Sequence, residues 1–350
     1  MAMPVIETAG SPYDLGYQHG RQAAEQVQAT FHRFCNYEVG DAATREALTA
    51  VIEATVAKRR PEALEEIRGI AAGAGMNYAQ IRDLNFSGEL WSETFLDPPR
   101  RACTLVGLAQ TPHGELIGKS LDVTEGDEAY VLAQRVQPVN GYRFVHLTFA
   151  GTIWTDGGVN ECGLAEVNSS LCTCAHNWQG YPPFLLLREL LECCANVEEA
   201  TRRAIERDAI NYGNNILLAD ESGDLAVVER SVTRQALRRR ADDTSMLIAT
   251  NHSLTPELAE VLGGGKVLLT NSRERFERLL ELSPTPPDSL AGLENLFRAH
   301  TQPGGFCQHG QGNLHTIAAL IVAPRPRQIW VAHGAPCQNQ FLPISLERTV

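Results

Sequence analysis

The chain has 350 residues, 43% of them hydrophobic, and a formal net charge of −12. This composition supports a packed core and excludes a disordered chain, and the absence of a basic block argues against a nucleic-acid partner. No apolar run approaches a membrane span and no secretory signal is visible, so we expect a cytoplasmic protein whose nine cysteines are reduced thiols.

The first hundred residues are predicted to be helical. Ser11 suits the cap of a helix that starts at Pro12 and runs to about residue 34. Three further helices are expected, at residues 43–58, 61–72 and 78–86. Paired prolines at 98 and 99 then interrupt regular structure, which predicts an exposed, basic linker over residues 95–101.

After this linker the pattern changes to short β-prone runs. Residues 103–109 and 115–121 flank Thr111-Pro112-His113-Gly114, which is a hairpin signal. Similar pairs of runs flank residues 220–223 and 324–327. Further strands are expected at 143–149, 164–171, 247–250 and 316–322, with helices at 184–195, 198–207, 273–282 and 290–299. The chain shows no internal repeat, and the alternation predicts an α+β fold of antiparallel sheets covered by helices.

Cys103 begins a β-run directly after the linker. Taken alone, such a cysteine is most often a small buried residue at the start of a strand. Several other segments stand in a fixed order around it: Gly10-Ser11-Pro12-Tyr13-Asp14-Leu15-Gly16, Gly118-Lys119-Ser120-Leu121-Asp122, Asn160-Glu161-Cys162-Gly163-Leu164, Ala249-Thr250-Asn251-His252, Asn271-Ser272-Arg273-Glu274-Arg275-Phe276, and Ile329-Trp330-Val331-Ala332 with Pro336-Cys337. Together with Cys103-Thr104, this ordered set resembles the isopenicillin N acyltransferase and carcinine hydrolase family of N-terminal-nucleophile (Ntn) cysteine hydrolases.

The resemblance implies a four-layer αββα Ntn-hydrolase fold that is made as an inactive precursor. The precursor would cut itself between Ala102 and Cys103, leaving a helical α chain (1–102) and a catalytic β chain (103–350) that forms one integrated domain. Chemistry supports this order of events, because a thiol with a pKa of about 8.5 needs a base within reach. A free α-amino group on Cys103, with a pKa of roughly 7.7 to 8.0, would serve as that base, whereas an uncut amide nitrogen cannot.

Two residues of the hairpin are candidates for the site. The resemblance implies that Asp122 holds the α-amino group and the thiol, and a tight hairpin would return it close to Cys103. Lys119 stands where related hydrolases usually carry Arg, and a positive charge near Cys103 would favour the thiolate. Strand periodicity places Ser120 and Asp122 on one face and Lys119 on the other. A turn-capping Asp and a solvated strand Lys are the alternative interpretations.

Two further candidates come from the second half of the chain. The resemblance implies that the Asn251 amide is one oxyanion donor and that Arg275 supports the nucleophile. Helix spacing alone would place Arg275 on an exposed face rich in ion pairs. A backbone N–H near Ser169 or Ser170 is expected as the second oxyanion donor, and His252 is not expected to be the base.

The sequence departs from the family pattern at two positions. Ala102 stands where the family usually has Gly, and self-cleavage through a strained peptide favours a residue that tolerates positive φ. Gln308 stands where an Arg near a substrate carboxylate is expected, which argues against a β-lactam or amino-acid carboxylate as the binding partner.

These observations predict a self-cleaving Ntn cysteine amidohydrolase or acyltransferase that forms an acyl-Cys103 intermediate. The substrate is expected to be a small acylated amine, amide or acyl thioester, and the two fragments are expected to stay associated. The sequence leaves a homo-oligomer open and predicts no cofactor and no metal, because Cys172-x-Cys174-x-His176 lacks a second ligand pair. Two alternatives remain: an unprocessed, catalytically silent ligand-binding protein on the same fold, and a thiol protease that pairs Cys with His.

Overall fold

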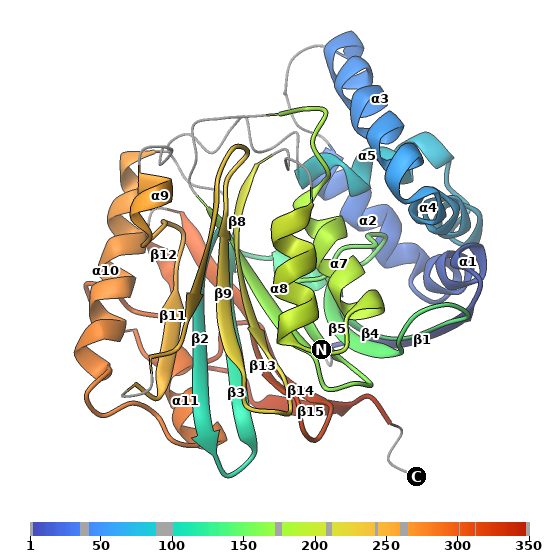
Figure 1. The fold of residues 1–350 in the computed structure, drawn as a ribbon. Helices are drawn as coiled ribbons and strands as arrows, with labels where there is room; N and C mark the ends of the chain where they lie inside the picture. The colour runs from blue at the N-terminus through green and yellow to red at the C-terminus, as the bar shows by residue number, and fades with distance from the viewer. Residues whose placement is uncertain are drawn as a thin grey trace.

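The computed structural model describes residues 3–35, 42–88, 101–171, 177–207, 212–241, 244–259, 265–300, 302–311 and 313–347. The described residues form two stacked β-sheets (Figure 1). The first sheet contains, in spatial order, β1 (Val5–Gly10), β4 (Val131–Pro138), β5 (Phe144–Phe149), β6 (Gly157–Asn160), β7 (Ala165–Leu171), β8 (Gly213–Ala219), β9 (Leu225–Arg230) and β10 (Gln235–Arg239). The second contains β11 (Met246–Ala249), β2 (Ala102–Thr111), β3 (Gly114–Val123), β13 (Leu314–Ala323), β14 (Gln328–His333) and β15 (Phe341–Ser345), with β12 (His309–Gln311) beside β13.

Helices cover the outer face of each sheet. The first sheet carries α7 (Pro183–Cys193) and α8 (Val197–Glu206), and the second carries α10 (Lys266–Leu282) and α11 (Leu290–Arg298). Two short turns of helix lie in connections: η1 (Asp127–Tyr130) between β3 and β4, and α9 (Pro256–Ala259) between β11 and α10. The predicted hairpins and helices of this region are confirmed. The helix α10 begins seven residues earlier than the predicted range 273–282, at Lys266, directly after its N-cap residue Gly265. The result is the predicted αββα layering, with the main apolar core between the sheets.

The N-terminal helices gather near the β1 end of the first sheet (Figure 1). They are α1 (Pro12–Gln22), α2 (Ala24–Cys35), α3 (Ala42–Arg59), α4 (Pro61–Ala74) and α5 (Tyr78–Asn85). The predicted cap at Ser11 is confirmed, since its hydroxyl accepts from the Asp14 N–H. In the described part of the chain no helix is long and apolar enough to cross a membrane.

Three expectations for this segment are wrong. The single helix expected from Pro12 to residue 34 is interrupted at Ala23, whose backbone leaves the helical conformation. The segment is not wholly helical, because residues 5–10 form β1 and pair in parallel with β4. That strand is only six residues long, and its alternation of buried Ile6 and Thr8 is too short a pattern to stand out. Of the predicted exposed linker, residues 95–100 lie outside the described residues, and Arg101 is buried rather than exposed.

Glycines set the contact between α1 and α4. A Cβ at Gly16 would lie 1.9 Å from the Glu66 carbonyl oxygen, and one at Gly73 would lie 2.2 Å from the Tyr17 carbonyl oxygen. The two helix backbones therefore touch directly, which only residues without a side chain permit.

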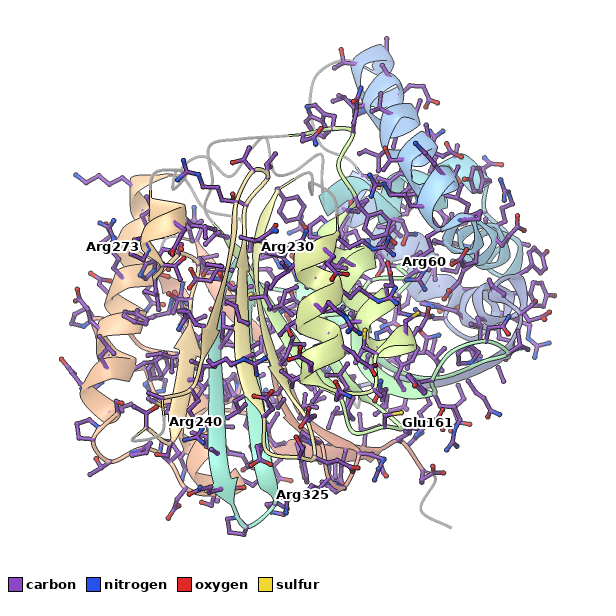
Figure 2. All side chains as sticks on the ribbon, in the orientation of Figure 1. Arg60, Glu161, Arg230, Arg240, Arg273 and Arg325 are labelled. Atoms are coloured by element: carbon purple, nitrogen blue, oxygen red, sulfur yellow. The ribbon has the colours of Figure 1, made fainter. Side chains whose placement is uncertain are left out.

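The helical segment is joined to the sandwich by buried polar contacts. His19 Nε2 accepts from the Gly151 N–H at 2.9 Å, and Asn85 Nδ2 donates to the Gly151 carbonyl at 2.9 Å. The Ile153 N–H donates back to Asn85 Oδ1 at 2.8 Å. Arg60, seen in Figure 2 at the junction of the N-terminal helices with α7, donates to the carbonyl of Leu185 on α7. The helices are thus tied to the sandwich through both backbone and side chains.

Candidate active site

The β2–β3 hairpin decides which side chains meet around Cys103. In its antiparallel register Cys103 lies opposite Leu121, Leu105 opposite Lys119, and Ala102 opposite Asp122. Directly opposed residues share a face, so Cys103 and Lys119 face the core between the sheets, whereas Asp122 faces the α10 side. The expected return of Asp122 to the start of β2 is confirmed, as is the opposite orientation of Lys119.

The backbone of Cys103 is held at both of its polar groups. Its N–H donates to Asn251 Oδ1 at 3.0 Å, and its carbonyl accepts from Arg275 Nη1 at 2.5 Å. Arg275 Nη2 also donates to Asn251 Oδ1, at 2.8 Å. Because two donors converge on Oδ1, the orientation of the Asn251 amide is fixed, and its Nδ2 donates to the Ser170 carbonyl at 2.9 Å.

Arg275 is the centre of this arrangement. It is fully buried and also donates to Thr104 Oγ1 at 3.0 Å and to Asn271 Oδ1 at 2.9 Å. The exposed face that helix spacing suggested belongs instead to neighbours such as Arg273, which Figure 2 shows on the outer side of α10. The resemblance therefore placed Arg275 correctly beside Cys103, and the spacing did not.

Three neutral donors surround the fully buried Asp122. Thr316 Oγ1 donates to its Oδ1 at 2.6 Å, while Gln308 Nε2 and Ser120 Oγ donate to its Oδ2 at 3.0 and 3.1 Å. Burial raises the pKa of Asp122, although the charge of Arg275 and these hydrogen bonds oppose the rise. Gln308 is thus a partner of Asp122, and it is linked onward because Asn271 Nδ2 donates to its Oε1 at 2.9 Å.

On the other face of the hairpin, buried charges surround the thiol. Lys119 Nζ donates to Asp156 Oδ1 at 2.8 Å, and Arg101 pairs with the same oxygen. The Arg101 guanidinium also lies 4.7 Å from the centre of the Phe184 ring. Burial raises the pKa of the Cys103 thiol, the charges of Lys119 and Arg101 lower it, and those of Asp122 and Asp156 raise it. The pKa of Asp156 is lowered, because Arg101 and Lys119 outweigh the effect of its burial.

Sequence reasoning missed Asp156 and Arg101, and it treated Gln308 only as the loss of an Arg expected near a substrate carboxylate. Asp156 has no fixed spacing to Cys103, because it comes from the turn before β6 in the other sheet. The one available signal was the need of a buried Lys119 for a counterion. Arg101 was assigned to the linker because of its proline neighbours.

The remaining candidates have limited roles in the geometry. His252 Nδ1 lies 2.8 Å from Ser272 Oγ, and burial together with the charges of Arg273 and Arg275 lowers its pKa to about 4. It is therefore neutral and bonded elsewhere. Ala102 lies within β2 and is not among the described residues with positive φ, so its Cβ brings no backbone strain. The sequence 172–176, including the weak metal pattern, lies outside the described residues.

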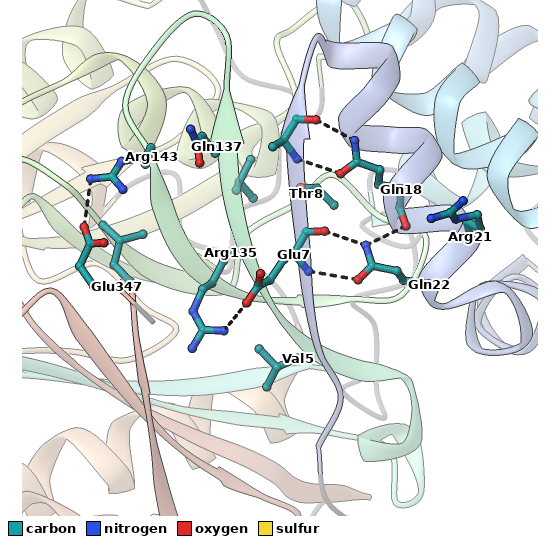
Figure 3. A pocket seen from close by; sticks show the side chains of 13 residues that line it. Val5, Glu7, Thr8, Gln18, Arg21, Gln22, Arg135, Gln137, Arg143 and Glu347 are labelled. Carbon is teal, nitrogen blue, oxygen red and sulfur yellow. Dashed lines mark hydrogen bonds and ion pairs between the residues drawn. The ribbon is translucent and has the colours of Figure 1, made fainter. Parts of the chain in front are cut away.

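A pocket of about 990 Å³ lies away from Cys103, between β1, α1, β4 and the C-terminal residues (Figure 3). Its polar groups are engaged with one another: Arg135 pairs with Glu7 at 3.1 Å, and Gln22 bonds the Glu7 backbone. Cys103 itself has no exposed surface in the uncut chain. The pocket therefore offers no access to the thiol.

Comparison with known proteins shows the family of the chain. A family profile described as "Acyl-coenzyme A:6-aminopenicillanic acid acyl-transferase" matches residues 110–338, about two thirds of the chain. The chain belongs to this family. Membership confirms the predicted enzyme class, an acyltransferase or amide hydrolase of the Ntn type.

Individual relatives of this acyltransferase family are distant. The "Acyl-coenzyme A:6-aminopenicillanic-acid-acyltransferase 40 kDa form" of Emericella nidulans is 27% identical over 256 residues, which are 71% of this chain and 69% of that protein. "Protein dcd1A" of Dictyostelium discoideum is 25% identical over 241 residues, 58% of this chain and 53% of its own length. The structure of penicillin V acylase from Agrobacterium tumefaciens matches with a TM-score of 0.50 and 17% identity, covering 71% of this chain and 89% of that one. This similarity of fold confirms the predicted Ntn-hydrolase architecture.

Proposed function

We propose that this acyltransferase-family member cuts itself between Ala102 and Cys103 and then uses Cys103 as an N-terminal nucleophile on a small acylated amine or amide. One observation carries the proposal: residue 103 is clamped at its N–H by Asn251 and at its carbonyl by Arg275, while its thiol lies on the opposite face between cations. Such a clamp fixes the peptide nitrogen that must become the catalytic amine.

The first step is self-cleavage. The Cys103 sulfur attacks the Ala102 carbonyl carbon, an S–C bond forms, and the C–N bond breaks as the nitrogen takes up the thiol proton. Water then hydrolyses this thioester, which releases the Ala102 carboxylate and restores the thiol. The clamp supports the step because it holds the backbone of residue 103 still while the thiol turns toward the carbonyl.

The second step is turnover by the mature enzyme. The new α-amino group occupies the position of the former amide nitrogen, 3.0 Å from Asn251 Oδ1 in the uncut chain, and accepts the thiol proton. Lys119 favours the thiolate by its charge. The thiolate attacks the substrate carbonyl, the amine leaves with the proton, and water or a second amine takes the acyl group from sulfur. Asn251 Nδ2 serves as an oxyanion donor once it leaves the Ser170 carbonyl.

The two fragments would stay associated in one folded molecule after the cut. The β1–β4 ladder and the buried contacts of His19 and Asn85 join residues 1–102 to the sandwich without using the Ala102–Cys103 bond. The α fragment therefore acts as a permanent part of the fold. Arg101 differs from these contacts, because its ion pair with Asp156 lies one residue before the bond that is cut.

A thiol protease built on a Cys–His pair has less support. Within the described part of the chain no histidine hydrogen-bonds to Cys103, and the nearest in sequence to the network, His252, is held by Ser272. The amine of Cys103 is therefore the better base.

The decisive experiment is denaturing gel electrophoresis and intact mass of the purified full chain, with N-terminal sequencing of the large fragment. We expect fragments 1–102 and 103–350, the latter starting at Cys103. Cys103→Ala should stay uncut and lose at least about 10⁴-fold of the amidase activity, while Cys193→Ser, at an exposed cysteine, should behave like the wild type. A fully active wild type that remains one unbroken chain, or turnover by Cys103→Ala, contradicts the proposal.

A further inference from the structure

A second cluster of chemically reactive side chains lies beside β12. Cys307 and His309 lie where the chain enters β12, His300 follows α11, and Cys337 lies in the turn between β14 and β15. The sulfurs of Cys307 and Cys337 lie 3.3 and 3.4 Å from the same atom, Nε2 of His309. Among the described residues, the ligand atoms of His300, His309 and Cys337 lie within 4.8 Å of one another.

Thiol–imidazole hydrogen bonds hold this cluster together in the metal-free chain. A neutral imidazole offers one acceptor lone pair, at the nitrogen that carries no proton. The two thiols therefore share one acceptor at Nε2, which is a weaker arrangement than two separate hydrogen bonds.

Three of these side chains, His300, His309 and Cys337, lie close enough together to hold one tetrahedral metal ion, and Cys307 becomes the fourth ligand once its side chain turns toward them. With Zn–S bonds of about 2.3 Å and Zn–N bonds of about 2.0 to 2.1 Å, the sulfur and nitrogen ligands of a tetrahedral site lie roughly 3.5 Å apart. The two S···N distances of 3.3 and 3.4 Å are close to that edge length. Two thiolates and two imidazoles form a donor set that favours zinc over magnesium or calcium.

We propose that Cys307, His309, Cys337 and His300 bind a structural zinc ion. On binding, the two thiols release their protons to solvent, and two Zn–S and two Zn–N bonds form without any change of oxidation state. His300 and His309 are exposed and Cys337 is partly so, which leaves the ion a path of entry. The site goes beyond the proposed amidase reaction and takes no part in its chemistry.

The zinc ion would fix the backbone around Gln308, next to the candidate active site. Gln308 lies between two of the ligands in sequence and donates to Asp122. Tying Cys307 and His309 to the turn at Cys337 would hold Gln308 in that position. The spacing in sequence gave no signal, because Cys337 follows His309 by 28 residues, unlike the close ligand pairs of zinc fingers.

The test uses the full-length protein after removal of metal with a chelator. Titration with Co²⁺ should give the visible bands of a tetrahedral site and a thiolate-to-cobalt charge-transfer band, which Zn²⁺ then abolishes. Metal analysis after zinc loading should find about one ion per chain, and loading should raise Tm. This part of the test needs no variant.

Variants then locate the site. Cys337→Ser and His309→Ala should lose the charge-transfer band or weaken it more than ten-fold at equal Co²⁺. Two controls, Cys193→Ser and Cys174→Ser, should keep it. Absence of the band in the wild type, an unchanged band in Cys337→Ser, or a Cys307–Cys337 disulfide in the non-reduced protein would each overturn the proposal, and none of these readouts depends on self-cleavage or turnover.

Discussion

Two buried polar networks in this molecule differ in the kind of group that connects them. The nucleophile network consists of Cys103, Asn251, Arg275, Asp122 and Gln308, and most of its links are hydrogen bonds through neutral amides and hydroxyls. The docking network, where the N-terminal helices meet the sandwich, consists of His19, Arg60, Glu66, Arg188 and Glu192. It is built mainly from ion pairs.

The two networks also differ in how completely they are satisfied. In the docking network Arg188 Nη1 and His19 Nδ1 are buried without a hydrogen-bond partner, and Arg60 Nε has only an ion pair with Glu62, at 3.8 Å. The side chains of Asn251, Arg275 and Asp122, in contrast, leave no buried polar atom unpaired. Directional bonds to neutral groups fix atomic positions, whereas buried ion pairs hold elements together at the cost of desolvation. We therefore expect changes in the nucleophile network to alter rates, and changes in the docking network to alter stability.

The largest expected effect comes from the docking network. Glu192 accepts from Arg188 Nε at 2.6 Å and pairs with Arg60, and Glu192→Ala would leave both guanidinium groups buried with less compensation. Removing one partner of a buried ion pair destabilises a protein by about 3 to 5 kcal/mol. Urea denaturation should show this loss, while kcat of the folded fraction stays within about two-fold of the wild type.

A matched control is Glu198→Ala, because Glu198 pairs with Arg239 on the surface and its side chain is 74% exposed. An exposed pair contributes only about 0 to 1 kcal/mol. If Glu192→Ala lowered kcat strongly at unchanged stability, the division between the two networks would be wrong.

The nucleophile network should respond in the opposite way. Asn251→Ala removes the acceptor of the Cys103 N–H and the proposed oxyanion donor, so kcat should fall by about 10²–10³-fold, equivalent to about 3 to 4 kcal/mol of barrier. Pre-cleaved enzyme and uncut chain should be assayed separately, since self-cleavage should slow as well. Asn251→Asp keeps Oδ1 but lacks the donor, so a rate equal to that of the wild type would remove Asn251 from the oxyanion hole.

Much of the fold followed from local sequence signals. The hairpins and most helices were predictable because turn residues, caps and periodicity are local properties of a short stretch. β1 was not predicted because it pairs with residues of β4 that lie 128 positions further along the chain (Val5 with Ala133), and pairing over that distance leaves no local pattern. The break at Ala23 was not predicted because the sequences on both sides of it favour a helix.

Most of the site was predictable because the resemblance supplied it, and part of its geometry followed from the hairpin. Lys119, Asp122, Asn251 and Arg275 all lie around Cys103, although their roles remain proposals. Asp156 could not be found, because a counterion from a different sheet depends on how the two sheets stack. The alternation of strand faces did place Lys119 correctly, since it depends only on the period of two along β3.

Lowering the pH should destabilise the folded protein through His19 of the docking network. Burial, aided by the charge of Arg188, lowers the pKa of His19 to about 3, against about 6.5 in the unfolded chain. Between pH 6.5 and 3, His19 is protonated in the unfolded state and neutral in the folded state. The contribution of neutral His19 to the free energy of unfolding is therefore fully present above pH 6.5 and is lost as the pH falls from 6.5 toward 3. At pH 4 the loss attributable to His19 is about 3 kcal/mol.

His19→Gln tests this assignment, because the Gln oxygen can still accept from the Gly151 N–H without titrating. Its free energy of unfolding should fall less steeply than that of the wild type between pH 6.5 and 4. The stability of the variant should still depend on pH to some extent, since burial also lowers the pKa of the neighbouring His146. Identical slopes for variant and wild type would exclude His19 as the group responsible.

The smallest effect distinguishes charge from position within the active site itself. Lys119 lowers the pKa of the Cys103 thiol and Asp156 raises it, so Lys119→Met and Asp156→Asn should move the acid limb of the kcat/KM profile in opposite directions. Loss of the cation disfavours the thiolate and shifts the limb to higher pH, lowering kcat/KM at pH 7 about ten-fold, or ~1.4 kcal/mol. Loss of the carboxylate shifts the limb to lower pH. Lys119→Arg should restore the profile, because it keeps the charge beside Asp156. Arg188→Met, a cation of the docking network, should lower Tm and leave the limb in place, and a limb that moved in this variant would show that the two networks are not separate.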